Sequence, residues 1–196
     1  MKKSLIVIIV IAAVVAIIFF WYTGTYNKLV ASDEAVTAQW GNVENQYQRR
    51  SDLIPNLVAT VKGYATHEQS TLEGVVEARA KATQVTVDPT NITPEALAKF
   101  QEAQSGVSSA LSRLLVSVEA YPDLKANQNF LDLQSQLEGT ENRISTERTR
   151  FNDVAKTFNT MIRKFPANII ANMSGFTAKP YFKAEEGSEK APEVQF

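Results

Sequence analysis

An uninterrupted apolar run near the N-terminus, residues 5–22, constrains this chain more than any other feature. It reads LIVIIVIAAVVAIIFFWY and contains no charged residue. As an α-helix with a rise of about 1.5 Å per residue it extends roughly 27 Å, close to the hydrocarbon thickness of a bilayer. A helix buried in a protein core rarely has apolar residues on every face. The run therefore predicts a transmembrane helix, and the lipid bilayer is the first expected partner.

A cleaved signal peptide is the main alternative to a retained anchor. The apolar run is longer than usual for a signal peptide, and bulky Phe19 and Phe20 lie where cleavage would require small residues. Trp21 and Tyr22 instead resemble the aromatic belt found at membrane interfaces. These features favour the uncleaved anchor.

The charges beside the run indicate its orientation. Lys2 and Lys3 precede it, whereas Lys28 is the only nearby base after it and is accompanied by Asp33 and Glu34. The positive-inside rule then predicts a cytoplasmic N-terminus and an extracytoplasmic main domain. We expect a single-pass protein of the cell (inner) membrane.

The composition excludes several kinds of chemistry. The 196 residues suffice for one ordinary domain plus an anchor. With 20 basic and 21 acidic residues, the chain lacks the basic surplus that nucleic-acid binding requires, so no nucleic acid is expected as a partner. It has no cysteine and one histidine, His67, which leaves little material for a metal site or a catalytic dyad. A weak site of His67 with Glu68 or Glu73 is the alternative, but we expect no catalytic residue, cofactor or metal.

The residues after the anchor show helical periodicity. Val36, Trp40, Val43 and Tyr47 are separated by four, three and four positions, which places them on one helix face and Trp40 in the core. No proline occurs in residues 23–54, so the transmembrane helix is expected to continue into the first helix of the soluble domain.

Capping residues predict where a second helix begins. Ser51 or Asp52 can cap a new helix, because Pro55 would then lie in its first turn, where proline is tolerated. This helix is expected to run towards Val85 and to bend near Gly63.

Two further helices follow a predicted loop at residues 86–94. Thr93 caps the third helix with Pro94 at its first position, and the helix stops at residues 121–122. Apolar positions from Phe130 to Ile162, separated by three, four or seven, predict a long fourth helix that ends at residues 163–164. The expected fold is all-α, an antiparallel four-helix-type bundle continuous with the N-terminal transmembrane helix.

The chain is accordingly divided into four regions. Residues 1–4 are a short basic N-terminus, residues 5–22 the anchor, residues 23–183 the helical bundle domain and residues 184–196 a disordered polar tail. Within the bundle domain, residues 168–182 are apolar but aperiodic and are expected to pack on the bundle as a strap.

Several motifs resemble those of the LemA family of bacterial membrane proteins. The residues that carry the resemblance are Trp40, RRSDLIPNLVATVKGYATHE (49–68), Ala78, Arg79, YPDLKA (121–126), FLDLQSQLEGTENRIS (130–145), Arg148, Phe151, Asn152, Asn159, Phe165, Pro166, Asn168, GF (175–176) and YF (181–182). DLIPNLV followed by TENRI is the most specific part. The resemblance implies a tethered four-helix bundle with no established enzymatic activity. One relative acts in building magnetosome membranes, which by analogy implies a membrane-organising role.

Two polar groups are candidate interaction or structural sites. The first lies at the predicted boundary between the first and second helices. It comprises Arg49, Arg50, Ser51, Asp52 and Asn56. It is either a hinge or docking surface, or a helix cap whose arginines bind nearby carbonyls and acids. Caps account for these residue types at these positions, which favours the structural interpretation.

The second polar group lies in the middle of the predicted fourth helix and comprises Glu141, Arg143, Glu147, Arg148 and Arg150. Glu147 is three or four residues from Arg143 and Arg150, which suits ion pairs on a solvated face. Glu141 and Arg148 are seven residues apart and could instead form a buried network between helices with Arg79. The sequence leaves both interpretations open.

These features together favour a non-catalytic, membrane-anchored helical scaffold or adaptor that forms a homo-oligomer at the membrane surface. The alternative is a regulatory or sensing subunit of a membrane protease, kinase or transporter complex, with an unknown membrane protein as partner. Functional polar residues inside the anchor would favour that alternative, and residues 5–22 contain none.

Overall fold

The computed structural model describes residues 2–65 and 68–183, and this part of the chain is helical without a β-strand. The predicted all-α fold, with a long apolar helix at its N-terminus, is confirmed. The helices are α1 (Lys2–Lys62), α2 (Gln69–Gln84), α3 (Pro94–Val118), α4 (Pro122–Lys125), α5 (Gln128–Arg163) and α6 (Ala167–Met173). His67 and the predicted tail at residues 184–196 lie outside the described residues.

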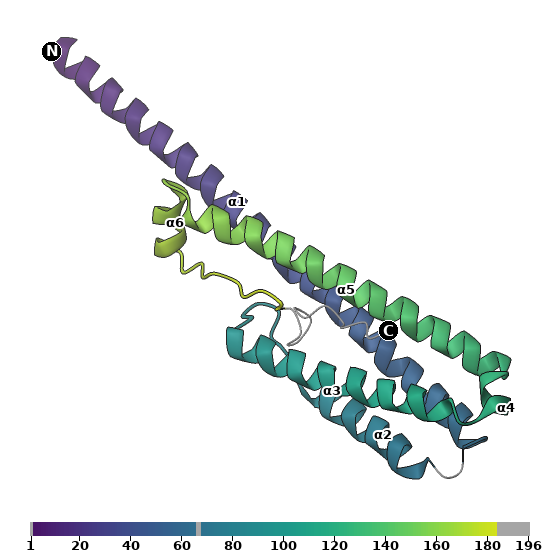
Figure 1. Ribbon diagram of the computed structural model, residues 1–196. Helices are drawn as coiled ribbons and strands as arrows, with labels where there is room; N and C mark the ends of the chain where they lie inside the picture. The colour runs from purple at the N-terminus through teal and green to yellow at the C-terminus, as the bar shows by residue number, and fades with distance from the viewer. Residues whose placement is uncertain (1, 66–67, 184–196) are drawn as a thin grey trace, which may run out of the picture.

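α1 is a single helix of 61 residues that contains both the apolar run and the first helix of the bundle (Figure 1). Among the described residues it is the one helix long and apolar enough to cross a membrane, and its most apolar segment is not covered by the rest of the protein. The rest of α1 packs in the bundle, so the apolar segment and the domain share one continuous helix.

The predicted start of a second helix at Ser51 or Asp52 is wrong. α1 continues through Pro55 to Lys62, and the chain turns at Gly63 before α2 begins. The low helix propensity of glycine favours an end at this position. Pro55 lies inside the helix, where it cannot donate the backbone hydrogen bond that the carbonyl of Ser51 would otherwise accept.

Other helix boundaries follow the sequence signals. Thr93 Oγ1 accepts a hydrogen bond of 3.1 Å from the N–H of Ala96, with Pro94 in the first turn of α3, as predicted. α3 ends at Val118, slightly before the predicted stop, and the single turn of α4 follows. α5 ends at Arg163, where the prediction placed it.

The four long helices pack as two pairs (Figure 1). α5 runs antiparallel to α1 and packs along it, whereas α3 packs on α2, which also contacts α1. α3 and α5 make no comparably close contact, and a groove lies between them. The bundle is therefore open along the side where α3 and α5 face each other.

The core consists of two buried clusters along the bundle. The proximal core, nearer to the apolar run, includes Leu29, Trp40, Phe100, Phe151, Phe158 and Phe182. The distal core includes Ile54, Leu57, Val75, Leu114, Leu124 and Phe130. α1 contributes to both clusters, so its continuity couples the two halves of the bundle.

Trp40 is fully buried, as its helical spacing predicted. Its ring lies edge-on to Phe100 and Phe151, at centroid distances of 5.2 and 5.8 Å, and stacks on Phe182 at 5.9 Å. These neighbours come from α3, α5 and the C-terminal segment, so Trp40 joins three elements to α1. Offset and edge-to-face aromatic pairs of this kind add to the stabilisation from burial.

The C-terminal segment contains more regular structure than the sequence predicted, because its first part forms α6. Gly175 then has φ of 76°, the left-handed region that favours glycine, and redirects the chain. Residues 177–183, here called the strap, continue without helix along α5. Asn159 and Asn152 of α5 hold the strap through paired hydrogen bonds to the backbone of Lys179 and Phe182.

The spacing of these two asparagines matches the repeat of the strap. Each side-chain amide donates to the carbonyl of its partner and accepts from the N–H of the same residue, at 2.8 Å for Lys179 and at 3.0 and 2.8 Å for Phe182. Seven residues of helix rise about 10.5 Å, and three residues of extended chain span about 10 Å. Asn152 and Asn159 therefore fix the register of the strap on α5.

Candidate functional site

Arg50 of α1 lies at the centre of a buried polar network. Its side chain is 2% exposed. Nη1 donates to Ser108 Oγ and to Glu141 Oε1, each at 2.8 Å. Nη2 donates to the backbone carbonyl of Gln104 at 3.0 Å and to its side-chain oxygen at 2.6 Å. Ser108 and Gln104 belong to α3 and Glu141 to α5, so one guanidinium joins three helices.

A charge buried this deeply is tolerated only when it is paired and hydrogen-bonded. The planar guanidinium suits the position because its donors point in fixed directions towards separate acceptors. The network of Glu141, Arg148 and Arg79, one of the two interpretations that the sequence left open, is not formed, since Glu141 pairs with Arg50. The reason is the helix arrangement: α5 packs along α1, whereas α2, which carries Arg79, packs on α3.

Arg50 also contributes to the polar groove between α3 and α5. The groove has a volume of about 680 Å³. Its polar lining comprises Tyr47 and Arg50 from α1, Gln101, Glu102, Gln104, Ser105, Ser108 and Ser109 from α3, and Glu141 and Arg148 from α5. The two arginines are balanced by two glutamates, so the groove suits neutral polar groups better than an isolated ion.

Tyr47 lies beside the Arg50 guanidinium. Burial raises the pKa of the Tyr47 phenol, and the positive charges of Arg148 and Arg50 oppose that increase in part. The guanidinium carbon of Arg50 is 5.1 Å from the centroid of the Tyr47 ring, which is cation–π geometry. A phenol with a raised pKa stays protonated at neutral pH, so Tyr47 contributes packing and polarity here rather than a base.

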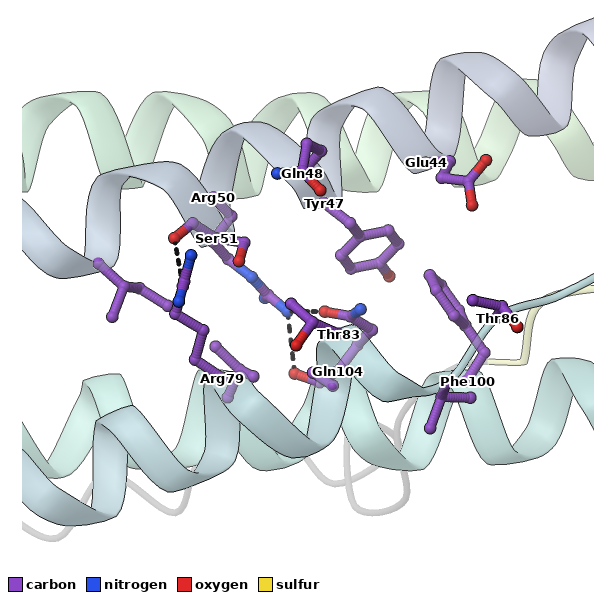
Figure 2. Close-up of a pocket in the computed structure, with 14 residues that line it drawn as sticks. Glu44, Tyr47, Gln48, Arg50, Ser51, Arg79, Thr83, Thr86, Phe100 and Gln104 are labelled. Carbon is purple, nitrogen blue, oxygen red and sulfur yellow. Dashed lines mark hydrogen bonds between the residues drawn. The ribbon is translucent and has the colours of Figure 1, made fainter.

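Arg79 of α2 supplies the hydrogen bond that Pro55 cannot. Its Nε donates to the backbone carbonyl of Ser51 at 2.8 Å. In a regular helix this carbonyl would accept from the N–H of residue 55, which proline lacks. Figure 2 shows the contact beside a cavity of about 180 Å³, between α1, α2 and α3, with Arg50 and Gln104 also on its wall. The contact accounts for the continuity of α1 through Pro55.

Replacing Arg79 by methionine is expected to lower the free energy of unfolding by about 1–3 kcal/mol, because it leaves the Ser51 carbonyl without a donor. In a Pro55→Ala background the same replacement should cost less than half as much, since the alanine supplies the missing N–H. Urea unfolding followed by circular dichroism measures both costs. Lys81→Met, at an exposed position of α2, is the control and should change stability by at most about 0.5 kcal/mol. Equal costs for Arg79→Met in the two backgrounds would contradict this role.

Four of the predicted site residues are not drawn into the network. Arg49, Asp52 and Asn56 are exposed on α1, and Arg143 is exposed on α5. Asp52 accepts a hydrogen bond of 2.7 Å from Gln48, one turn earlier on the same helix. These residues face solvent, where they are available to a partner.

Arg148 and Glu147 hold other parts of the protein together. Arg148 Nη2 donates to the carbonyl of Lys183 at 2.8 Å and so binds the end of the strap. Glu147 forms the expected ion pair with Arg150 at 2.7 Å, and it also accepts a hydrogen bond of 2.7 Å from Gln39 of α1. The second polar group is therefore divided between the α1–α5 contact and the strap.

Sequence reasoning missed the amides and hydroxyls that complete the site. Gln104 and Ser108 are four residues apart on one face of α3, but such residues are common on solvated faces and carry no distinct signal. Asn152 and Asn159 are seven apart and share a stripe of α5, which was a usable signal for a bound backbone segment.

The geometry offers binding surfaces rather than reactive groups. Among residues 2–65 and 68–183, no cluster of three or more His, Asp or Glu side chains could hold a metal ion. The charged groups at the centre of the network are committed to structural hydrogen bonds.

Comparison with known proteins identifies the family. The model of the LemA family matches residues 39–196, which is most of the chain. The chain belongs to the LemA family. Two motifs that carried the LemA resemblance meet in the site: DLIPNLV contains Pro55, and TENRI contains Glu141, the partner of Arg50.

Three LemA-family relatives illustrate the range of the similarity. Magnetosome protein MamQ 2 of Paramagnetospirillum magneticum is 28% identical over 84% of this chain and 66% of its own length. Magnetosome protein MamQ of Magnetospirillum gryphiswaldense is 29% identical over 80% of this chain and 64% of its own length. Protein LemA of Metamycoplasma hominis is 25% identical over 84% of this chain and 72% of its own length. The chain spans slightly less than two thirds of the magnetosome relatives, and none of the three is named for an enzymatic activity.

Proposed function

We propose that this chain is a non-catalytic, membrane-anchored helical scaffold that self-associates at the membrane surface. The observation that carries the proposal is the unbroken α1, which joins the apolar run to the bundle in one rod. A rigid connection gives every copy a similar orientation and so lowers the entropy lost on lateral association. Confinement to a membrane raises the effective concentration, so weak contacts between bundles suffice.

The polar network supports a structural rather than a chemical role. Arg50 and Arg79 bind α1 to its neighbours, which keeps the bundle rigid around α1. The flanking charges favour a cytoplasmic N-terminus and an extracytoplasmic bundle. The likeness to magnetosome proteins favours a role in organising a membrane surface.

Cysteine crosslinking tests the proposal directly, because the chain contains no cysteine. Arg49→Cys places one thiol on an exposed part of α1. In native membranes, a membrane-permeant bismaleimide should convert this variant to dimers. A membrane-impermeant reagent should do the same on spheroplasts if the bundle is extracytoplasmic.

Thr140→Cys, at a position that is 1% exposed in the bundle, is the matched control and should not crosslink. Monomer alone with the permeant reagent, tested also at a second exposed position such as Arg143→Cys, would contradict self-association. Dimers with the permeant reagent only would mean that the bundle is cytoplasmic.

A second candidate function is a regulatory or sensing subunit of a membrane protease, kinase or transporter complex. The polar groove between α3 and α5 favours it, since its neutral, hydrogen-bonding lining suits a peptide segment from another protein. The crosslinking experiment separates the two functions. A prominent adduct of higher mass that contains a different membrane protein, without a dimer, would favour the subunit.

A further inference from the structure

α6 and Phe165, two residues before it, present an apolar face that no part of the described chain covers. Phe165, Ile169 and Met173 are 81%, 48% and 75% exposed. They are four residues apart in sequence, which places the two helical members on one side of α6. Ile170 and Ala171, on the other side, are buried in the proximal core. The joint exposure of three large apolar side chains indicates a surface that a membrane or another protein covers.

The place of α6 in the fold points to its partner. α6 lies at the end of the bundle that adjoins the apolar run (Figure 1). The ring of Phe176, just after α6, is 6.1 Å from that of Tyr26 on α1. Tyr26 follows the interfacial Tyr22 by four residues, a rise of about 6 Å. Phe176 therefore holds the end of this segment about one turn of α1 from the predicted edge of the membrane.

The charges at this end of the bundle fit a lipid surface. Arg163 and Lys164 are exposed directly before the apolar face. From residue 154 to residue 183 the sequence contains no Asp or Glu. An apolar face flanked by bases is the pattern of helices that lie in the interface of a bilayer, with the apolar side about 5–10 Å into the headgroup–acyl boundary.

We propose that the face formed by Phe165, Ile169 and Met173 is a second membrane contact, which inserts into the headgroup–acyl boundary beside the transmembrane segment. The inference rests on the membrane anchoring of α1 and does not require self-association. The unbroken α1 keeps the bundle in line with the membrane-spanning segment but leaves it free to rotate about the axis of this helix. A second contact on one side of the bundle restricts that rotation, so the groove between α3 and α5 faces a defined direction.

Lipid-borne quenchers test the contact in the full-length chain. Met173→Cys carries an environment-sensitive fluorophore, and single chains are placed in nanodiscs that contain phosphatidylglycerol and a phosphatidylcholine with a doxyl group on its acyl chain. We expect blue-shifted emission and at least twofold stronger quenching than for the same label at Val116→Cys. Val116 is the matched apolar control, because it is 71% exposed near the end of α3 remote from the apolar run.

Two further arms separate insertion from mere proximity and from contact between copies. Thr177→Cys, an exposed polar position just after α6, should be quenched less than Met173→Cys. Equal quenching at residues 173, 177 and 116 would overturn the proposal. A blue shift that appears only with two chains per nanodisc, without doxyl quenching, would overturn it in favour of a second copy. All labelled positions are exposed, so unchanged thermal unfolding confirms that the variants are folded.

The two proposals can fail separately. If no dimers form in the crosslinking experiment but the lipid quenching at residue 173 is observed, the scaffold function is contradicted and the α6 contact is supported. Strong crosslinking with no quenching at residue 173 would remove the α6 contact alone.

Discussion

Replacing Trp40 by alanine is expected to lower the free energy of unfolding by about 3–5 kcal/mol. The indole is fully buried and contacts Phe100, Phe151 and Phe182. Truncation removes this burial and leaves a cavity whose walls come from α3, α5 and the strap. Because three separate elements line the cavity, no single movement can close it, and the cost should lie towards the upper end of the range for large-to-small changes.

The second tryptophan provides a matched control for this prediction. Trp21 lies in the predicted membrane interface and is 40% exposed, outside both core clusters. Trp21→Ala should leave the unfolding midpoint of the bundle unchanged in the same detergent or nanodisc, whereas Trp40→Ala should lower it clearly. An unchanged midpoint for Trp40→Ala would contradict its place in the core and make it a candidate for contact with a partner.

Trp40 shows which part of the fold the sequence could predict. Its spacing from Val36, Val43 and Tyr47 required only the helical period, and all four residues are buried. The cap at Thr93 was equally local, because a hydroxyl residue directly before a proline is typical of a helix N-cap followed by Pro at the first helical position. For Trp40 and Thr93 the decisive interactions lie within one or two helical turns, and the sequence reasoning was correct.

Pro55 shows where that reasoning fails. Locally, a cap residue followed by proline predicts a helix start, and the penalty for proline inside a helix supports this interpretation. The penalty is offset by Arg79, which lies on another helix and supplies the missing donor. The prediction depended on a contact between residues 28 positions apart, which no local pattern reveals.

The partner of Glu141 could not be predicted for a similar reason. The stripe of α5 that contains Glu141 and Arg148 was correctly recognised as polar. Which helix faces this stripe depends on how the other helices pair. Because α2 packs on α3 and also contacts α1, Arg79 binds the Ser51 carbonyl of α1, and Glu141 of α5 pairs with Arg50. The polar residues of the site could thus be predicted from the sequence. Their hydrogen-bond and ion-pair partners could not, because these depend on how the four long helices pack.

Replacing Arg50 by alanine is expected to lower the free energy of unfolding by about 3 kcal/mol. The change removes a buried aliphatic stem and leaves four acceptor groups on α3 and α5 without their donor. Arg49→Ala, one residue earlier and exposed, should change stability by at most about 0.5 kcal/mol. Urea unfolding of the full-length chain in one detergent measures both variants.

A double-mutant cycle separates the charge of Arg50 from its other contacts. Glu141 is 42% exposed, so solvent screens its charge, and Glu141→Gln alone is expected to cost only about 1 kcal/mol. Arg50→Met retains much of the packing but loses every donor. Because three of the four acceptors are uncharged groups on α3, most of the cost of Arg50→Met should persist in the Glu141→Gln background, with a coupling energy of about 1 kcal/mol. A coupling equal to the whole cost of Arg50→Met would instead make the ion pair to α5 the dominant interaction. The hydrogen bonds to α3 would then contribute little, and the edge of the groove formed by α3 would have to be held in place by the packing of α3 on α2.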